Sequence, residues 1–331
     1  MNSEAILKVK NLITTFETES GKIRAVDDVS FEVCKGRTYG IVGESGCGKS
    51  VTALSIMRLL PKPSGRIENG QIFFKDMDIV QFPAEKMHEI RGRCIAMIFQ
   101  EPMTALNPVH TIRKQIGEVF QLHLKDMSKA EIHKESIRAL INVGIPDPEE
   151  CLKEYPHHIS GGMRQRVMIA MALAAKPDIL IADEPTTALD VTIQAQILSL
   201  IEDLQKKTGM SVIFITHDLG VIAEICDDVV VMYAGKVAET ASTYELFKHP
   251  KHPYTKGLLA SIPTLTSQRK TRLNIIKGMV PGLDELPDGC RFENRCPNAM
   301  EKCKQKIPPM TKISDHHYVS CFLYGSSPDV V

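Results

Sequence analysis

Residues 43–50 read Gly-Glu-Ser-Gly-Cys-Gly-Lys-Ser, and this spacing of glycines before a lysine and a serine constrains the fold more than any other segment. It matches G-x-x-x-x-G-K-[ST], the P-loop, whose backbone N–H groups surround phosphate. A strand-like run precedes it at 37–42, and an apolar helical pattern follows from Val51 to Leu60. Strand, glycine loop and helix in this order predict a nucleotide site in an α/β domain.

The P-loop supplies three kinds of ligand. Its backbone N–H groups point at the β- and γ-phosphates, Lys49 adds a positive charge, and the Ser50 hydroxyl is placed to bind Mg²⁺. The predicted nucleotide-binding residues are Gly43, Glu44, Ser45, Gly46, Cys47, Gly48, Lys49 and Ser50.

A second strand-like run, residues 178–184, ends in the carboxylates Asp183 and Glu184. We expect Asp183 to lie beside the P-loop and to hold Mg²⁺ through a bound water. Glu184 is expected to point the other way off the pleat, where it would act as a general base or position the attacking water. Two solvated acids at a strand end are the alternative, which a chain with a P-loop disfavours.

The segment 159–166, Ile-Ser-Gly-Gly-Met-Arg-Gln-Arg, resembles the signature sequence of ATP-binding cassette (ABC) ATPases, with Ile159 in place of Leu and Met163 in place of Gln. Ser160, Gly161 and Gly162 precede a helix predicted over Met163–Ala175, whose N-terminal N–H groups and dipole form an anion site. The resemblance implies that this site serves the γ-phosphate of ATP held by the other cassette of a dimer.

The resemblance assigns roles to four further residues. Gln100 matches the glutamine that contacts Mg²⁺ or the lytic water and senses the membrane partner. Asp190, in Ala188-Leu189-Asp190, matches the D-loop at the dimer seam, and His217 matches the switch histidine that reaches the γ-phosphate. Phe16 is a candidate for stacking on adenine, although a core phenylalanine explains it nearly as well.

The predicted fold class is α/β, a RecA-like P-loop core with a helical insertion and a small irregular cysteine-rich tail. Residues 1–85 and 166–240 alternate strand and helix patterns and form the ATP-binding core. Residues 86–165 are rich in helical patterns, for example Lys129 to Val143, and form the signature subdomain. From 241 to 331 prolines, histidines and cysteines accumulate and the long periodic segments stop.

The tail indicates which group of ABC ATPases this chain resembles. Residues 100–108 and 252–263 resemble peptide and nickel importer ATPases, and Gly289 to Pro297, continuing to Cys303 and Cys321, resembles the C-terminal motif of dipeptide and oligopeptide importer ATPases. The resemblance covers nearly the whole chain, from a strand predicted at Leu7 to Val9 through Cys321. It implies an ATPase subunit of a peptide importer.

Four of the nine cysteines, Cys290, Cys296, Cys303 and Cys321, have five, six and seventeen residues between them. Disulfides are rare in the cytoplasm, and the short spacings typical of zinc sites are missing, which favours a [4Fe–4S] cluster over zinc. Family tails of this type carry such a cluster, and this strengthens the prediction. Four free structural thiols are the remaining alternative.

Composition limits the other function classes. The formal net charge is +0 and no long basic block occurs, which argues against a nucleic-acid partner. No run of eighteen apolar residues and no N-terminal export pattern are visible, so we expect the chain to stay in the cytoplasm. The resemblance implies that it works at the cytoplasmic face of the cell membrane, through other subunits. A GTPase is disfavoured because the N-K-x-D motif is missing.

The sequence therefore predicts an ATPase that energises a membrane importer for dipeptides or oligopeptides, with ATP, Mg²⁺ and a [4Fe–4S] cluster as cofactors. The resemblance implies a second, similar but distinct ABC ATPase subunit, two transmembrane permease subunits and an external peptide-binding protein as partners. A nickel or other small-solute importer would use the same cassette. A soluble ABC ATPase is a further alternative, but it would need a long heptad insertion or a second cassette.

Overall fold

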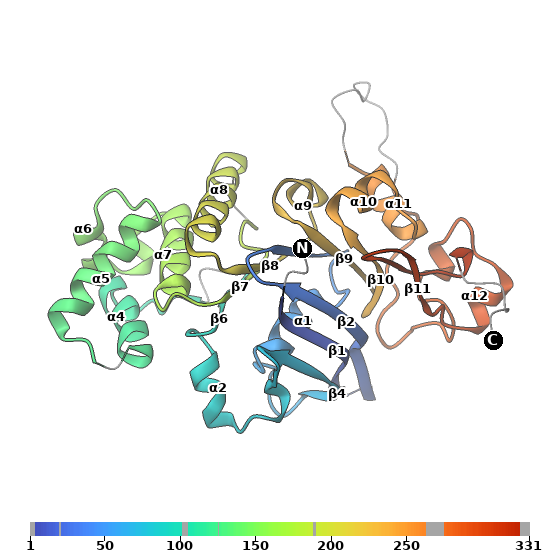
Figure 1. The fold of residues 1–331 in the computed structure, drawn as a ribbon, viewed down its shortest axis with the longest axis horizontal. Coiled ribbons are helices and arrows are strands. Elements are labelled where there is room, and N and C mark those ends of the chain that lie inside the picture. The colour runs from blue at the N-terminus through green and yellow to red at the C-terminus, as the bar shows by residue number, and fades with distance from the viewer. Residues whose placement is uncertain are drawn as a thin grey trace. The chain divides into compact units, whose positions relative to one another are not determined.

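The computed structural model describes residues 4–19, 21–100, 105–124, 126–187, 190–262 and 275–324. The chain forms two compact units, and each is described separately. The P-loop unit comprises residues 4–33, 38–80 and the chain from 215 onward. The signature unit comprises Cys34–Arg37 and Gln81–Phe214. Figure 1 shows the elements of both units.

One sheet of the P-loop unit is antiparallel, with strand order β2-β1-β4-β5. Its strands are β1 (Ala5–Thr18), β2 (Gly21–Cys34), β4 (Gly65–Phe74) and β5 (Met77–Asp78). β1 pairs with β4 from Leu7 opposite Phe74 to Phe16 opposite Gly65, and the register shifts between Lys10 and Thr14. A short 3₁₀ turn, η1 (Ile79–Gln81), follows β5.

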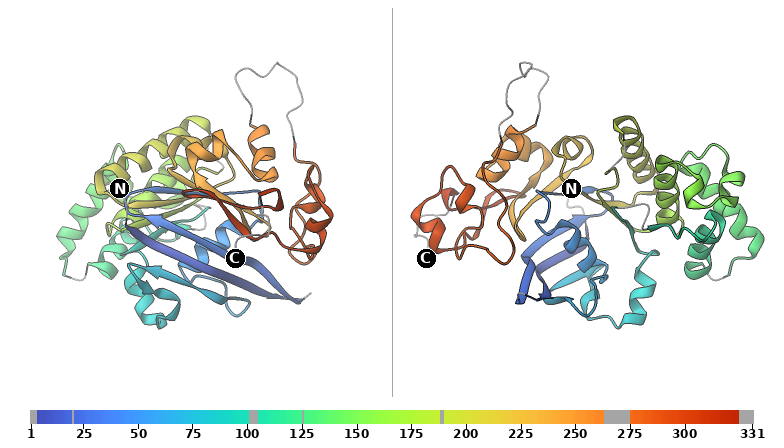
Figure 2. Two further views of the ribbon diagram at one scale, coloured as in Figure 1. Left: turned by 45° about the vertical axis from the view of Figure 1, so that its right-hand side comes forward. Right: turned by 180° about the vertical axis from the view of Figure 1, so that it is seen from behind.

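The other strands of this unit follow the order β11-β12-β10-β9-β3. They are β3 (Thr38–Val42), β9 (Asp228–Tyr233), β10 (Lys236–Ser242), β11 (Met310–Ser314) and β12 (His317–Ser320). β3 and β9 run parallel, while β10 pairs antiparallel with both β9 and β12. Figure 2 shows the tail strands, in red, beside β10. The tail thus extends a sheet of the core.

Five helices and two 3₁₀ turns complete the described part of the P-loop unit. The helices are α1 (Lys49–Ile56), α9 (Leu219–Ile225), α10 (Thr243–Lys248), α11 (Pro253–Ala260) and α12 (Glu301–Gln305), and the turns are η3 (Glu293–Arg295) and η4 (Phe322–Tyr324). Three of these helices, α10, α11 and α12, lie in the tail, where no long periodic segment is predicted.

The signature unit contains the strands β6 (Ile95–Ile98), β7 (Ile179–Asp183) and β8 (Ser211–Thr216), in the order β8-β7-β6. β6 and β7 run parallel, and every residue of the three strands is buried, as expected for parallel strands covered by helices. The remaining elements are α2 (Ala84–Ile90), α4 (Ile112–His123), α5 (Lys129–Asn142), α6 (Pro148–Lys153), η2 (Pro156–His158), α7 (Gly161–Leu173) and α8 (Val191–Thr208).

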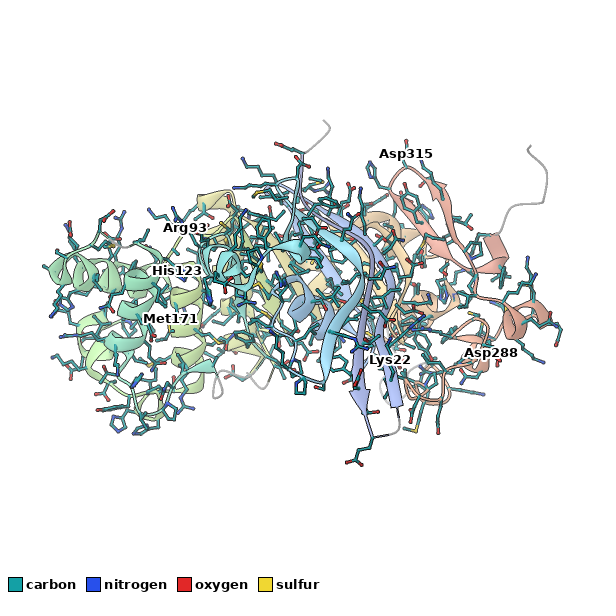
Figure 3. The ribbon with its side chains drawn as sticks, turned by 90° about the horizontal axis from the view of Figure 1, so that it is seen from below. Lys22, Arg93, His123, Met171, Asp288 and Asp315 are labelled. Atoms are coloured by element: carbon teal, nitrogen blue, oxygen red, sulfur yellow. The ribbon has the colours of Figure 1, made fainter. Side chains whose placement is uncertain are left out.

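Helices α4 to α7 gather into one helical group (Figure 1). Side chains cap their first turns: Thr111, Ser128 and Asp147 accept N–H groups of α4, α5 and α6. At the end of α4, His123 lies beside Arg93 (Figure 3), and burial and the arginine charge lower the pKa of His123. A Cβ on Gly92 would lie 2.5 Å from His123 Nε2, so this contact requires glycine.

Candidate nucleotide site

The predicted P-loop joins β3 to α1 in the P-loop unit. Gly48 is the N-cap of α1 with φ +102°, and a Cβ there would lie 2.6 Å from the Ala25 carbonyl oxygen. A Cβ on Gly43 would lie 2.2 Å from the Met232 carbonyl oxygen. Both positions therefore require glycine, and the loop enters α1 with the first helical N–H groups lacking partners within the helix. This is the backbone arrangement that binds phosphate.

Lys49 lies against its own loop. Its ammonium group donates to the carbonyl oxygens of Gly43, at 2.8 Å, and Glu44, at 3.2 Å. The residue is buried, whereas Ser45 and Gly46 at the loop tip are exposed. A positive charge held beside exposed loop backbone is the arrangement that an anionic ligand needs.

In the signature unit, strand β7 ends at Asp183, which is buried. Glu184 has left the strand and has φ +46°, a left-handed conformation that is uncommon for a residue with a side chain. Pleat alternation therefore does not set the direction of Glu184, contrary to the expectation above. Such strained residues concentrate at functional sites.

Two side chains orient the Glu184 carboxylate. Gln100 Nε2 donates to Glu184 Oε2 at 3.0 Å, and Thr187 Oγ1 donates to the same oxygen at 2.9 Å. The structure thus brings together two residues predicted for catalysis, Gln100 and Glu184, although 84 residues separate them in the chain.

The signature motif opens helix α7. Ser160 is the N-cap, and its hydroxyl accepts the N–H of Met163 at 3.3 Å. The helix begins at Gly161, two residues earlier than predicted, because the Ser160 cap allows both glycines to join the first turn. Ser160 and Gly161 are exposed. An exposed N-terminus of a thirteen-residue helix is suited to an anion.

Comparison with known proteins agrees with these motifs. A family model described as "ABC transporter" matches residues 26–187, and one described as "Oligopeptide/dipeptide transporter, C-terminal region" matches residues 238–303. The dipeptide transport ATP-binding protein DppD of Bacillus subtilis (strain 168) is 55% identical over 320 residues, which cover 97% of this chain and 95% of that protein. The chain belongs to the dipeptide/oligopeptide family of ABC transporter ATPases.

Other similar proteins support this assignment. The oligopeptide transport ATP-binding protein OppD of the same organism is 52% identical over 326 residues, covering 98% of this chain and 91% of OppD. A dimeric post-hydrolysis structure of the ATP-binding cassette MJ0796, bound to ADP and Pi, aligns with a TM-score of 0.64 and 27% identity over 72% of this chain and 98% of that chain. The structure of cbiO1 from Clostridium perfringens aligns with a TM-score of 0.63 and 28% identity over 74% and 92%. The predicted α/β cassette fold is therefore confirmed.

The other residues predicted for this ABC ATPase lie as follows. Asp190 is exposed and caps α8, where its Oδ1 accepts the N–H of Ile193 at 2.9 Å. Ala188 and Leu189 lie outside the described residues. His217 is exposed and directly follows β8, in the P-loop unit. Phe16 is half-buried on β1. The contacts of Asp190 are those of a helix cap, and its predicted role at a dimer seam stays a prediction.

The predicted four-thiolate site is not confirmed. Within the part of the chain that the structure describes, no group of three or more His, Cys, Asp or Glu side chains could hold a metal ion. Burial raises the pKa of Cys290 to about 11 and also raises those of Cys296 and Cys321. Cys303 is buried in α12, where its sulfur accepts the N–H of Met300 at 3.5 Å.

Among the described residues, no helix is both long enough and apolar enough to cross a bilayer.

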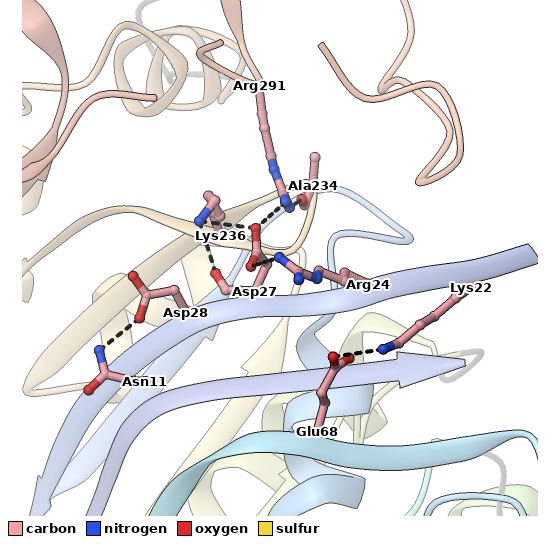
Figure 4. Close-up of polar contacts among 9 residues, drawn as sticks. All are labelled: Asn11, Lys22, Arg24, Asp27, Asp28, Glu68, Ala234, Lys236 and Arg291. Carbon is pink, nitrogen blue, oxygen red and sulfur yellow. Dashed lines mark hydrogen bonds and ion pairs between the residues drawn. The ribbon is translucent and has the colours of Figure 1, made fainter. Parts of the chain in front are cut away.

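Sequence reasoning missed the contacts that the tail makes with the core of the P-loop unit. Arg291, next to the first tail cysteine, donates to the Ala234 carbonyl oxygen and forms a buried ion pair with Asp27 (Figure 4). Lys236 Nζ lies 3.1 Å from the same Asp27 carboxylate. Burial lowers the pKa of Arg291, and the Asp27 charge opposes this effect. Since 264 residues separate Arg291 from Asp27, no local pattern could indicate the pair.

Proposed function

We propose that this chain is the ATP-hydrolysing subunit of an importer for dipeptides or oligopeptides. The observation that supports this most directly is the similarity to DppD and OppD over nearly the full length, together with the match of residues 238–303 to the oligopeptide/dipeptide transporter C-terminal region. We place the chain at the cytoplasmic face of the membrane, where ATP hydrolysis would be coupled to conformational change in the membrane subunits.

We assign the residues of the proposed site to phosphate binding, to Mg²⁺ binding or to the attacking water. We assign the loop Gly43–Ser50 to the phosphates, with Lys49 as the charged ligand, and assign Ser50, Asp183 and Gln100 to Mg²⁺. When bound, Mg²⁺ neutralises charge on the β- and γ-phosphates. Glu184 accepts a proton from the attacking water or orients it, and the hydrogen bonds from Gln100 and Thr187 hold its carboxylate in one orientation.

A dimer of cassettes completes the proposal. Ser160, Gly161 and Gly162 at the start of α7 would contact the γ-phosphate held by a second cassette, with Asp190 at the seam and His217 at the γ-phosphate. The dimeric form of the MJ0796 cassette supports this arrangement. We propose a distinct second ATPase subunit, two transmembrane permease subunits and an external peptide-binding protein as partners, by analogy with dipeptide and oligopeptide systems.

The substitution Glu184→Gln in the assembled transporter tests the catalytic assignment. The amide keeps the shape of the side chain but cannot take a proton, so ATP hydrolysis should fall by about 10²–10⁴-fold while ATP binding persists. Glu301→Gln makes the same chemical change on the exposed surface of α12 and serves as the control. Near-normal hydrolysis by Glu184→Gln would remove this residue from the catalytic role.

The solute is tested separately, because the cassette does not contact it. Uptake of labelled dipeptide or oligopeptide by vesicles that carry the complete transporter should depend on ATP. Uptake of nickel but not peptide would favour the small-solute alternative. Hydrolysis by a chain that associates with no membrane subunit would favour a soluble ABC ATPase.

We also propose that Cys290, Cys296, Cys303 and Cys321 bind a [4Fe–4S] cluster. The family resemblance supports this. Cluster binding would require deprotonation of all four, which couples it to loss of protons. Iron and zinc analysis of anaerobically purified protein tests the proposal: about four irons per chain are expected, and one zinc without iron would contradict it.

A further inference from the structure

All three polar groups of Glu44, the second residue of the P-loop, have partners in the P-loop unit. Arg295 in the tail donates from Nη1 to Oε2 at 2.6 Å and from Nη2 to Oε1 at 3.0 Å. The Glu44 N–H donates to the Tyr254 hydroxyl at 2.9 Å. Its carbonyl oxygen accepts from Lys49 Nζ at 3.2 Å. Glu44 therefore connects two tail residues to the P-loop lysine.

A carboxylate in this loop creates an electrostatic problem. Glu44 lies one residue after Gly43 in a segment whose proposed ligand carries several negative charges, and like charges at short range oppose binding. The planar guanidinium of Arg295 satisfies both carboxylate oxygens at once and cancels the charge, which a single lysine ammonium could not do with the same geometry. The Arg295 side chain is only 4% exposed, whereas the Glu44 side chain is 31% exposed, so solvent reaches the pair from the carboxylate side only.

A packed aromatic group holds the two tail residues in place. Tyr233, Tyr254 and Phe292 contact one another with ring centroids 4.7 to 5.4 Å apart. The Arg295 guanidinium lies 5.7 Å from the Tyr233 ring centroid, and the Tyr233 hydroxyl accepts from Arg295 Nη1 at 3.3 Å. Tyr254 is fully buried. Neither Arg295 nor Tyr254 can turn away from Glu44 without disrupting this packing.

A second contact supports the same loop. Arg291 binds the Ala234 carbonyl oxygen, and the next residue, Gly235, donates its N–H to the Cys47 carbonyl oxygen at 2.9 Å. The tail thus contacts the P-loop directly at Glu44, through Arg295, and indirectly at Cys47, through Ala234 and Gly235.

We propose that the C-terminal segment is a working part of the nucleotide site, in which Arg295 and Tyr254 position the P-loop and Arg295 neutralises Glu44 so that ATP can bind. Arg295 and Tyr254 are positioning residues, since they act through Glu44 and Lys49. The inference rests on the proposed role of the P-loop in binding ATP.

A double-mutant cycle on the full-length chain tests the proposal, with the dissociation constant of Mg²⁺-ATP measured at a temperature where every variant is folded. Arg295→Met leaves the Glu44 carboxylate unpaired and should weaken Mg²⁺-ATP binding by about tenfold or more. In a Glu44→Gln background, where no charge remains to neutralise, Arg295→Met should change the dissociation constant by less than about threefold. Arg295→Lys should restore part of the affinity. Lys312→Met, which breaks an exposed tail ion pair with Asp315, should bind as the wild type does.

The outcomes separate this inference from the proposed function. If Lys49→Ala binds Mg²⁺-ATP as tightly as the wild type, the P-loop assignment itself fails. If Lys49→Ala loses binding but Arg295→Met only lowers the unfolding temperature, with an unchanged dissociation constant, the Arg295–Glu44 pair is merely structural and the inference is overturned. An equal loss from Arg295→Met in both backgrounds would also overturn it, because Arg295 would then not act through Glu44.

Discussion

At the residue scale, the backbone conformation of Glu184 determines the direction in which its carboxylate points. A left-handed backbone at the end of β7 moves the side chain off the strand, and hydrogen bonds from Gln100 and Thr187 then fix it. The sequence identified Gln100 and Glu184 by motif, but it could not show that they touch. Thr187 escaped notice because its role depends on the turn after Glu184, where its N–H donates to the Glu184 carbonyl oxygen.

Removing the Thr187 hydroxyl tests this orientation. Thr187→Val keeps the branched shape but cannot donate to the carboxylate, so hydrolysis should slow by about tenfold, the value of one hydrogen bond to a charged group. The affinity for ATP should change little, because the interaction concerns the water and not the phosphates. Thr187→Ser retains the hydroxyl and should hydrolyse ATP at close to the normal rate. A Val variant as fast as the Ser variant would show that Gln100 alone suffices.

At the element scale, helix α5 was readable from sequence. Ser128 with Glu131 forms a capping box at the start of α5, and this helix ends within one residue of the prediction. The long strand β1 was predicted only at Leu7–Val9. Asn11 adopts φ +49° and the register with β4 shifts beyond Lys10, so the alternation of buried residues is interrupted. Hydrogen bonds to the neighbouring strand β4 hold β1 together across this irregular part, and such pairing cannot be read from the local sequence.

Two glycines on helices of the signature unit should respond to alanine with opposite signs. Gly209 is the C-cap of α8 with φ +70°, and a Cβ there has open space, so Gly209→Ala should cost about 1 kcal/mol through backbone strain alone. Gly117 lies inside α4, where a Cβ would make an ordinary 3.5 Å contact with Ile132. Gly117→Ala should therefore stabilise by up to about 1 kcal/mol. Urea unfolding measures the change in unfolding free energy for each variant. Two changes of the same sign would contradict this prediction.

At the scale of the whole molecule, the tail and the core share one unit and one run of strands. The sequence predicted the cassette well because its motifs are local and each has a phosphate-binding reason. It predicted the tail poorly because the tail is held by distant contacts: Arg295 to Glu44 spans 251 residues, and Tyr254 to Glu44 spans 210. The tail strands β11 and β12 also lack the continuous buried run that made β3 and β7 recognisable.

Acid should weaken this unit through His252. The residue is buried, its Nδ1 accepts the N–H of Tyr254 at 3.0 Å, and burial lowers its pKa to about 4. The unfolded chain takes up this proton near pH 6.5, so stability is complete above that pH and falls, by on the order of 3 kcal/mol, as the pH drops toward 4. In chemical unfolding measured from pH 7.5 to 4.5, the free energy of unfolding should fall less steeply for His252→Asn than for the wild type. Parallel curves would exclude His252 as the source.

Strand β10 has one further consequence, for any shortened form of this protein. It is hydrogen-bonded on both sides, by β9 and by β12, and Val237, Ala238 and Ala241 along it are buried. A chain cut before Met310 would lose β11 and β12 and leave β10 as an open edge strand, a ready template for pairing with another molecule. Proteolysis or premature termination in the tail would then yield an aggregating species and not a smaller working cassette.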